Sequence, residues 1–254
     1  GDARMMRDRI ARALPEWTED RPGYHLLPAM HAFGLEECGA YAEAEQEGRR
    51  AAALRPGESW AQHAVAHVLE MQGRLKEGIA WMRDDPDLWS KDSLLAIHNW
   101  WHTALYHLDL GEIDEVLALY DGPIFGARPP FALPLGDAAA LLWRLMLRGV
   151  DVGPRWAVLA DLWAKVEGRS LYAFNDAHAV MAYVGAGRPD KTAETLADHE
   201  PPVLPATIGQ RVVFADAAQS GRLGSEIDDD SPAAQEIAAL AVEIDRLRIG
   251  RIAP

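Results

Sequence analysis

Two pairs of histidines near the middle of the chain are the residues whose types and spacing could do chemistry. His63 and His67 are four residues apart and Glu70 follows three residues later, which places all three on one face of a helix. His98 and His102 repeat the four-residue spacing. Paired imidazoles beside a carboxylate suit a zinc, iron or manganese site, and they equally suit general acid–base catalysis.

The two kinds of chemistry predict different sets of residues. A divalent metal ion (Zn, Fe or Mn) would take as ligands His63, His67, Glu70 and His98. Acid–base catalysis would use these four residues and His102, with the glutamate orienting a histidine. The glutamate that follows the first histidine in zincin proteases is absent, so the motif of that protease group is missing. Histidines that merely pack between helices, with their nitrogens bonded to backbone or water, are the structural alternative.

A glycine repeat predicts the elements that position these histidines. Glycines recur 34 or 38 residues apart, at Gly1, Gly39, Gly73, Gly111, Gly149, Gly187 and Gly221. Each one that lies inside the chain follows a stretch with the apolar spacing of a helix, as a glycine in the left-handed conformation does when it closes a helix. The clearest helices are expected over residues 40–54, 99–110, 113–120, 137–148, 155–167, 175–184, 190–199, 206–220 and 233–249. No convincing strand pattern is present.

Helix-turn-helix units of this length resemble the tetratricopeptide repeat. With the glycines at repeat position 15, Ala44 and Ala51 fall on the small-residue positions and Pro56 on the terminal proline. The predicted fold class is therefore all-α, a tetratricopeptide-like helical solenoid of about six repeats of 34 to 38 residues. Residues 1–254 would form a single helical-repeat domain, with a long Gly/Pro loop over 121–136 inside it.

The start of the chain predicts an incomplete repeat. A helix over residues 5–14 would be the second helix of a pair that lacks its first. A solenoid helix needs a neighbour to bury its apolar face. We therefore expect the chain to be a piece of a longer protein that lacks N-terminal repeats, or another chain to supply the missing surface.

The tetratricopeptide resemblance also implies a binding groove. In that family, fixed positions of each first helix face a concave surface, and the histidine pairs, Trp101 and Trp143 fall on or beside such positions. A groove walled by imidazole and indole rings suits a small molecule or an aromatic peptide anchor. The expected ligand-binding residues are His63, His67, His98, Trp101, His102 and Trp143.

Composition limits the class of protein. The net charge of -14 and the lack of a basic patch exclude general nucleic-acid binding. The single cysteine, Cys38, excludes an internal disulfide and thiolate-rich metal sites, and it favours a reducing, cytoplasmic location. No apolar run is long enough for a membrane span, so no membrane partner is expected.

Four segments resemble the tetratricopeptide repeat protein 38-like family: residues 30–37, 63–73, 98–102 and 141–145. The resemblance extends over nearly the whole chain and implies the helical-repeat fold, but it implies no activity. Because most tetratricopeptide arrays bind rather than catalyse, the first hypothesis is a binding protein whose groove holds a peptide, a protein segment or a small molecule. The alternative is a hydrolase or lyase that uses the histidines and Glu70, with or without a metal. A third hypothesis is self-association into a homo-oligomer.

Overall fold

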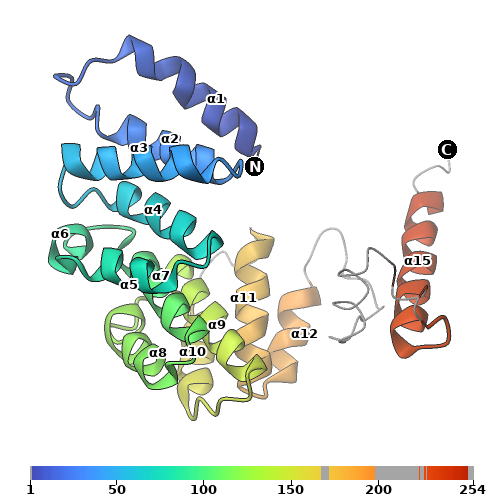
Figure 1. Ribbon diagram of the computed structural model, residues 1–254. Coiled ribbons are helices and arrows are strands. Elements are labelled where there is room, and N and C mark those ends of the chain that lie inside the picture. The colour runs from blue at the N-terminus through green and yellow to red at the C-terminus, as the bar shows by residue number, and fades with distance from the viewer. Residues whose placement is uncertain (1, 167–171, 198–222, 224–225, 227, 251–254) are drawn as a thin grey trace. The chain divides into compact units, whose positions relative to one another are not determined.

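The computed structural model describes residues 2–166, 172–197, 223, 226 and 228–250 (Figure 1). Every regular element in these residues is helical, which confirms the all-α class. Within the same residues, no helix is long and apolar enough to cross a membrane. The predicted helix over 206–220 and two of the recurrent glycines, Gly1 and Gly221, lie outside the described residues.

The chain divides into two compact units, residues 1–195 and 196–254, and each is described by itself. The expected single domain over 1–254 stays a prediction. In the second unit the described helix is α15 (Pro232–Gly250), which matches the helix expected over 233–249. The helices of the first unit are α1 (Ala3–Ala13), η1 (Leu14–Glu16), α2 (Leu26–Glu36), α3 (Tyr41–Leu54), α4 (Ser59–Met71), α5 (Leu75–Arg83), α6 (Pro86–Ser90), α7 (Ala96–Asp109), α8 (Ile113–Leu119), η2 (Tyr120–Ile124), α9 (Ala132–Leu147), α10 (Arg155–Trp163) and α11 (Ala173–Gly185). The next helix, α12 (Pro189–Ala197), begins in the first unit and ends two residues past its boundary.

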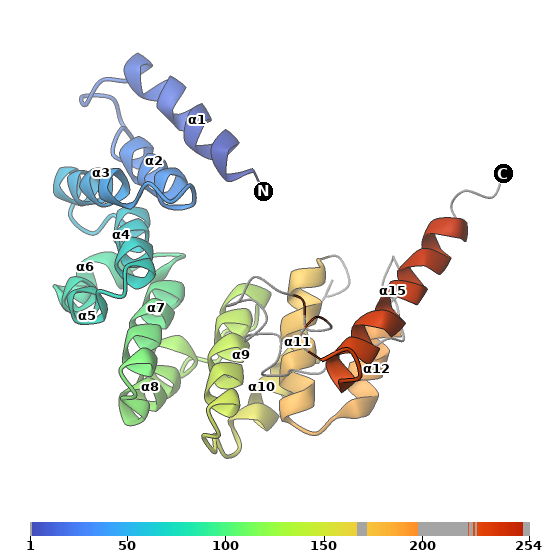
Figure 2. The ribbon, with the colours of Figure 1, turned by 45° about the vertical axis from the view of Figure 1, so that its right-hand side comes forward.

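Five helices of the first unit follow one another in a row. Helix α2 packs on α4, α4 on α7, α7 on α9, and α9 on α11 (Figure 2). We call these five helices the principal row. Helices α3, α5 and α10 each contact the row helix before them and the row helix after them. Each element therefore packs mainly on its near neighbours in the sequence, and consecutive row helices meet side by side.

The recurrent glycines close the row helices as predicted. Gly39, Gly73, Gly111, Gly149 and Gly187 have φ between 67° and 78°, the left-handed region. At Gly73, for example, the glycine N–H donates to the Glu70 carbonyl and the next N–H, of Arg74, donates to the Leu69 carbonyl. This is the hydrogen-bond pattern of a Schellman cap. A Cβ added at any of the five would meet nothing within 4 Å, so the backbone conformation, not space, requires glycine.

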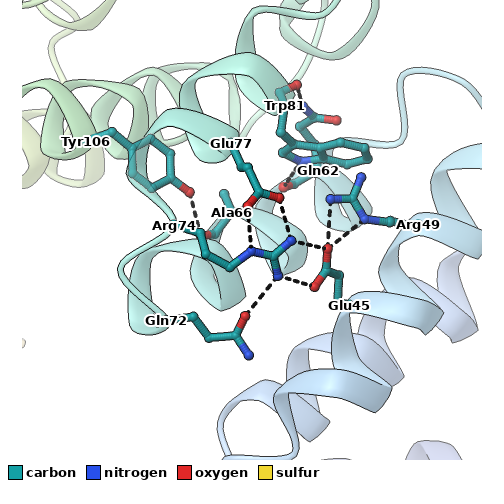
Figure 3. Close-up of polar contacts among 9 residues, drawn as sticks. All are labelled: Glu45, Arg49, Gln62, Ala66, Gln72, Arg74, Glu77, Trp81 and Tyr106. Atoms are coloured by element: carbon teal, nitrogen blue, oxygen red, sulfur yellow. Dashed lines mark hydrogen bonds and ion pairs between the residues drawn. The ribbon is translucent and has the colours of Figure 1, made fainter.

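Polar contacts fix the offset between α4, α5 and α7 (Figure 3). The Tyr106 hydroxyl of α7 donates to the Ala66 carbonyl of α4 at 2.6 Å. Its ring lies so close to α5 that a Cβ on Gly78 would be 2.3 Å from Tyr106 Cζ. The Arg74 guanidinium donates to Glu45 of α3 and to Glu77 of α5, each at 2.6 Å. These contacts hold the two helices that carry the histidine pairs in one register.

The expected loop over 121–136 is much shorter in the structure. Helix α8 leads into the turn η2, which is kinked at Gly122 (φ -95°, ψ -108°), and α9 begins at Ala132. Pro134 does not prevent this early start, because a residue in the first turn needs no intrahelical partner for its backbone nitrogen. Leu135 is fully buried in the apolar core, and its burial stabilises the first turn of α9. The glycines and prolines that predicted a long loop thus fall partly in helical turns.

Candidate metal centre

Two adjacent helices of the principal row bring the histidine pairs together. His63 and His67 lie on α4, and His98 and His102 lie on α7. One ring nitrogen from each of the four lies within 4.8 Å of the others. Neighbouring ring centroids are 4.3 to 5.1 Å apart. This four-histidine cluster (His63, His67, His98 and His102) could therefore hold a metal ion.

Carboxylates lie beside three of the four rings, and two of these contacts, those of His98 and His102, are hydrogen bonds. His98 Nδ1 lies 3.0 Å from Asp137 Oδ1 of α9, and His102 Nδ1 lies 2.9 Å from Glu70 Oε2 of α4. On the other side, His67 Nδ1 lies 3.3 Å from Glu36 Oε2 of α2. We call Glu36, Glu70 and Asp137 the carboxylate layer. An Nδ1 that donates to a carboxylate leaves Nε2 as the lone-pair donor, and metal-ligating histidines are held in this way.

The fourth ring, His63, faces another imidazole nitrogen directly. His63 Nε2 and His67 Nε2 are 3.0 Å apart. Two bare lone pairs repel at that distance, so the two nitrogens are joined either by an N–H···N hydrogen bond between neutral imidazoles or by a cation. Zinc–nitrogen bonds of about 2.0 Å in a tetrahedral site place two ligand nitrogens about 3.3 Å apart. The observed separation is thus close to that of two ligands on one ion.

Burial keeps the inner histidines neutral. His63 and His102 are each only 4% exposed. Loss of water around the imidazolium lowers the pKa of both well below 6.5, and the neighbouring histidines lower each pKa further. His102 Nε2 has no hydrogen-bond partner in the described part of the chain. A neutral ring with an unused Nε2 is the form of histidine that binds a metal.

The lowered pKa values predict that the metal-free protein loses stability in acid. The unfolded chain takes up protons on both histidines near pH 6.5, and the folded chain does so only at a lower pH. The free energy of unfolding should therefore fall below about pH 6.5, by about 1.4 kcal/mol per pH unit for each histidine. Urea unfolding at about pH 7 and about pH 5.5 measures this. His102→Gln should lose about half of that contribution, and an unchanged slope in the variant would contradict the assignment.

The structure gives Glu70 and His102 different places from the expected ones. Glu70 was expected among the metal ligands, but its carboxylate lies on His102 Nδ1, on the side of the ring away from Nε2. His102 was expected as a catalytic or ligand-binding residue and not as a metal ligand, and its ring is the fourth one that converges. Burial raises the pKa of the Glu70 carboxyl. Among the converging groups, His63, His67 and His98 stand where the sequence placed them.

Aromatic rings surround the cluster, but not all of them are the expected ones. Trp101 stacks on His98 with ring centroids 5.4 Å apart. Phe33 of α2 packs on His63 at 5.3 Å. Trp143 instead packs against Trp156 of α10, among the residues of the apolar core. Trp143, expected to bind a ligand in the groove, is therefore not part of this cluster.

The sequence analysis missed three residues beside the histidines: Phe33, Glu36 and Asp137. Glu36 precedes Glu70 by 34 residues, the shorter repeat length, so aligning the repeats would have found it. Phe33 lies one turn before Glu36 and follows from the same alignment. Asp137 carries no such signal, because it is 39 residues from its partner His98 and the repeat lengths are 34 and 38.

No protein-family model matches the chain. The resemblance to the tetratricopeptide repeat protein 38-like family therefore stays a prediction. The argument for function depends on the geometry of the four-histidine cluster.

Proposed function

We propose that this chain is a metal-binding helical-repeat protein whose four-histidine cluster holds one divalent ion of zinc, iron or manganese. The observation that carries the proposal is the convergence of four ring nitrogens within 4.8 Å, three of them from rings whose Nδ1 faces a carboxylate. Two of these carboxylates, Asp137 and Glu70, are hydrogen-bonded to a ring Nδ1, which is common around metal-ligating histidines.

The same proposal includes a tetratricopeptide-like solenoid. Its support is the packing of consecutive row helices and the left-handed glycine at the end of each. These features also agree with membership of the tetratricopeptide repeat protein 38-like family. A cytoplasmic location is proposed on the single cysteine alone.

For activity we propose a metal-dependent hydrolase or lyase. The His67 and His98 side chains are each 24% exposed, so a small molecule can reach this side of the cluster. A bound divalent ion would supply Lewis-acid polarisation of a carbonyl or of water. Iron and manganese accept more than four ligands and would leave positions open, whereas tetrahedral zinc would be filled by four imidazoles. A binding protein for a peptide, protein segment or small molecule is the second proposal, with the exposed edge of the cluster as its binding surface.

Metal analysis of the untagged protein tests the metal proposal. We expect about one equivalent of zinc, iron or manganese in the wild type and less than about a tenth in His63→Ala/His98→Ala, because two of four ligands are lost. His25→Ala/His178→Ala is the matched control, since it removes two histidines outside the cluster and should retain the metal. A metal-free wild type, prepared from cells supplied with each of the three metals, would refute the proposal. So would a double variant that is folded by circular dichroism and still binds the ion.

A further inference from the structure

An arginine stands beside the cluster on the helix that supplies Asp137. Arg144 lies seven residues after Asp137 on α9 and therefore on the same face. Its Cζ is 5.3 Å from the centroid of the Trp101 ring, and Trp101 in turn stacks on His98. The charge of Arg144 lowers the pKa of both His102 and Glu70. The guanidinium thus acts directly on the groups of the proposed centre.

Arg144 has donors to spare. Its Nη1 donates to the Ala140 carbonyl at 3.1 Å. No carboxylate of the described residues lies within ion-pair distance of it, whereas Arg148, one turn later, pairs with Asp109 at 2.6 Å. Arg144 is also exposed, so a ligand can reach the rest of its fork of N–H groups. An exposed arginine that no carboxylate of the described residues pairs with is placed to receive an anion from outside.

Trp101 supplies a second unsatisfied donor. Its indole Nε1 is buried and has no acceptor in the part of the chain that the structure describes. Its ring lies against His98 and His102, with centroids 5.4 and 5.0 Å away, and against Arg144. A ligand paired with the exposed guanidinium would lie beside this aromatic ring, and it would reach the buried N–H only if the side chains that cover the ring moved. A neighbouring aromatic ring favours an organic anion over a simple ion.

We infer that Arg144 and Trp101 form the anchor for a small monocarboxylate ligand with an aromatic or unsaturated body, which reaches the metal centre from the α9 side. The inference rests on the proposed metal site. A guanidinium fork matches the two oxygens of a planar carboxylate. When all three are ionised, the carboxylates of the layer carry three negative charges, and a divalent ion neutralises two of them. The positive charge of Arg144 neutralises the third. A monoanion therefore meets less repulsion than a phosphate dianion, in a protein whose net charge is already -14.

Benzoate binding to the metal-loaded full chain tests the inference. Titration calorimetry compares benzoate with neutral benzamide and with inorganic phosphate. We expect benzoate to bind more tightly than either, and Arg144→Gln to weaken it by about tenfold or more, since a charge-assisted pair is lost. Arg144→Lys keeps the charge without the fork and should fall between the two. Lys76→Gln removes one exposed positive charge from α5 and should leave benzoate affinity unchanged.

Metal content, measured on the same samples, separates the two proposals. Arg144 is not a ligand in the proposed site, so Arg144→Gln should keep about one equivalent of metal. Full metal content with no benzoate binding, or with equal binding in Arg144→Gln, would overturn the carboxylate inference alone. Tighter binding of phosphate than of benzoate would also overturn it. A wild type without metal would refute the proposed function and this inference with it.

Discussion

Saturating metal is expected to stabilise the wild-type protein by about 4 kcal/mol at about 1,000 times the dissociation constant, because the folded chain binds the ion and the unfolded chain does not. The ligands come from α4 and α7, whose facing surfaces separate on unfolding. Thermal denaturation with the ion, and after its removal by a chelator, measures the shift in Tm. Histidines of the unfolded chain that bind the ion weakly would reduce the shift without abolishing it.

The comparison is made within each variant, because the substitutions themselves change stability. His63→Ala/His98→Ala should show almost no difference between the metal-loaded and chelated samples. His25→Ala/His178→Ala should show the full wild-type difference. An equal shift in all three proteins would mean that the ion stabilises the chain from some other place, and the four-histidine site would then be wrong.

Local signals explain what the sequence could predict of this fold. The left-handed conformation at Gly39, Gly73 and the later recurrent glycines is a local feature of a helix C-terminus. It can be predicted without knowledge of distant residues. The four-residue spacing of the histidine pairs likewise fixes their common face on one helix. Repeat periodicity then made α4 and α7 neighbours, which brought the two pairs together.

Contacts between helices decide what the sequence could not predict. Glu70 and His102 both lie on the helix faces that the sequence predicted. The offset of α7 along α4 determines whether the Glu70 carboxylate or the His102 Nε2 points toward the other three histidines. The structure fixes that offset through Tyr106, which reaches the Ala66 carbonyl, and through the close approach of its ring to Gly78. A hydroxyl that bonds to a backbone carbonyl 40 residues away leaves no trace in local spacing.

The position of the cluster links it to the principal row as a whole. Its histidines lie on α4 and α7, and the carboxylate layer adds α2 and α9. Four consecutive row helices thus converge on one buried group of imidazoles. Displacement of any one of these helices would separate a histidine ring from the other histidines or from the carboxylate beside it. A bound ion would therefore fix the relative placement of the four helices as well as serve any chemistry.

The carboxylate layer yields the second large prediction. Glu70→Gln should weaken metal binding by about 10- to 100-fold, because an amide cannot support the charge on a metal-bound imidazole as a carboxylate does. The side chain keeps its size and its oxygen can still accept from His102 Nδ1, so the fold should be retained. Competition with a chromogenic chelator of known affinity measures the change in Kd.

The histidine–glutamate pair on α7 and the following turn is a control for this substitution. His107 Nδ1 lies 2.5 Å from Glu112 Oε2, and neither residue belongs to the cluster. Glu112→Gln should therefore leave metal affinity at the wild-type value. If Glu70→Gln also leaves it unchanged while His102→Gln abolishes binding, His102 ligates the ion without help from its carboxylate. If neither variant changes the affinity, His102 is not a ligand, and the site reduces to the three histidines that the sequence had already singled out for the metal.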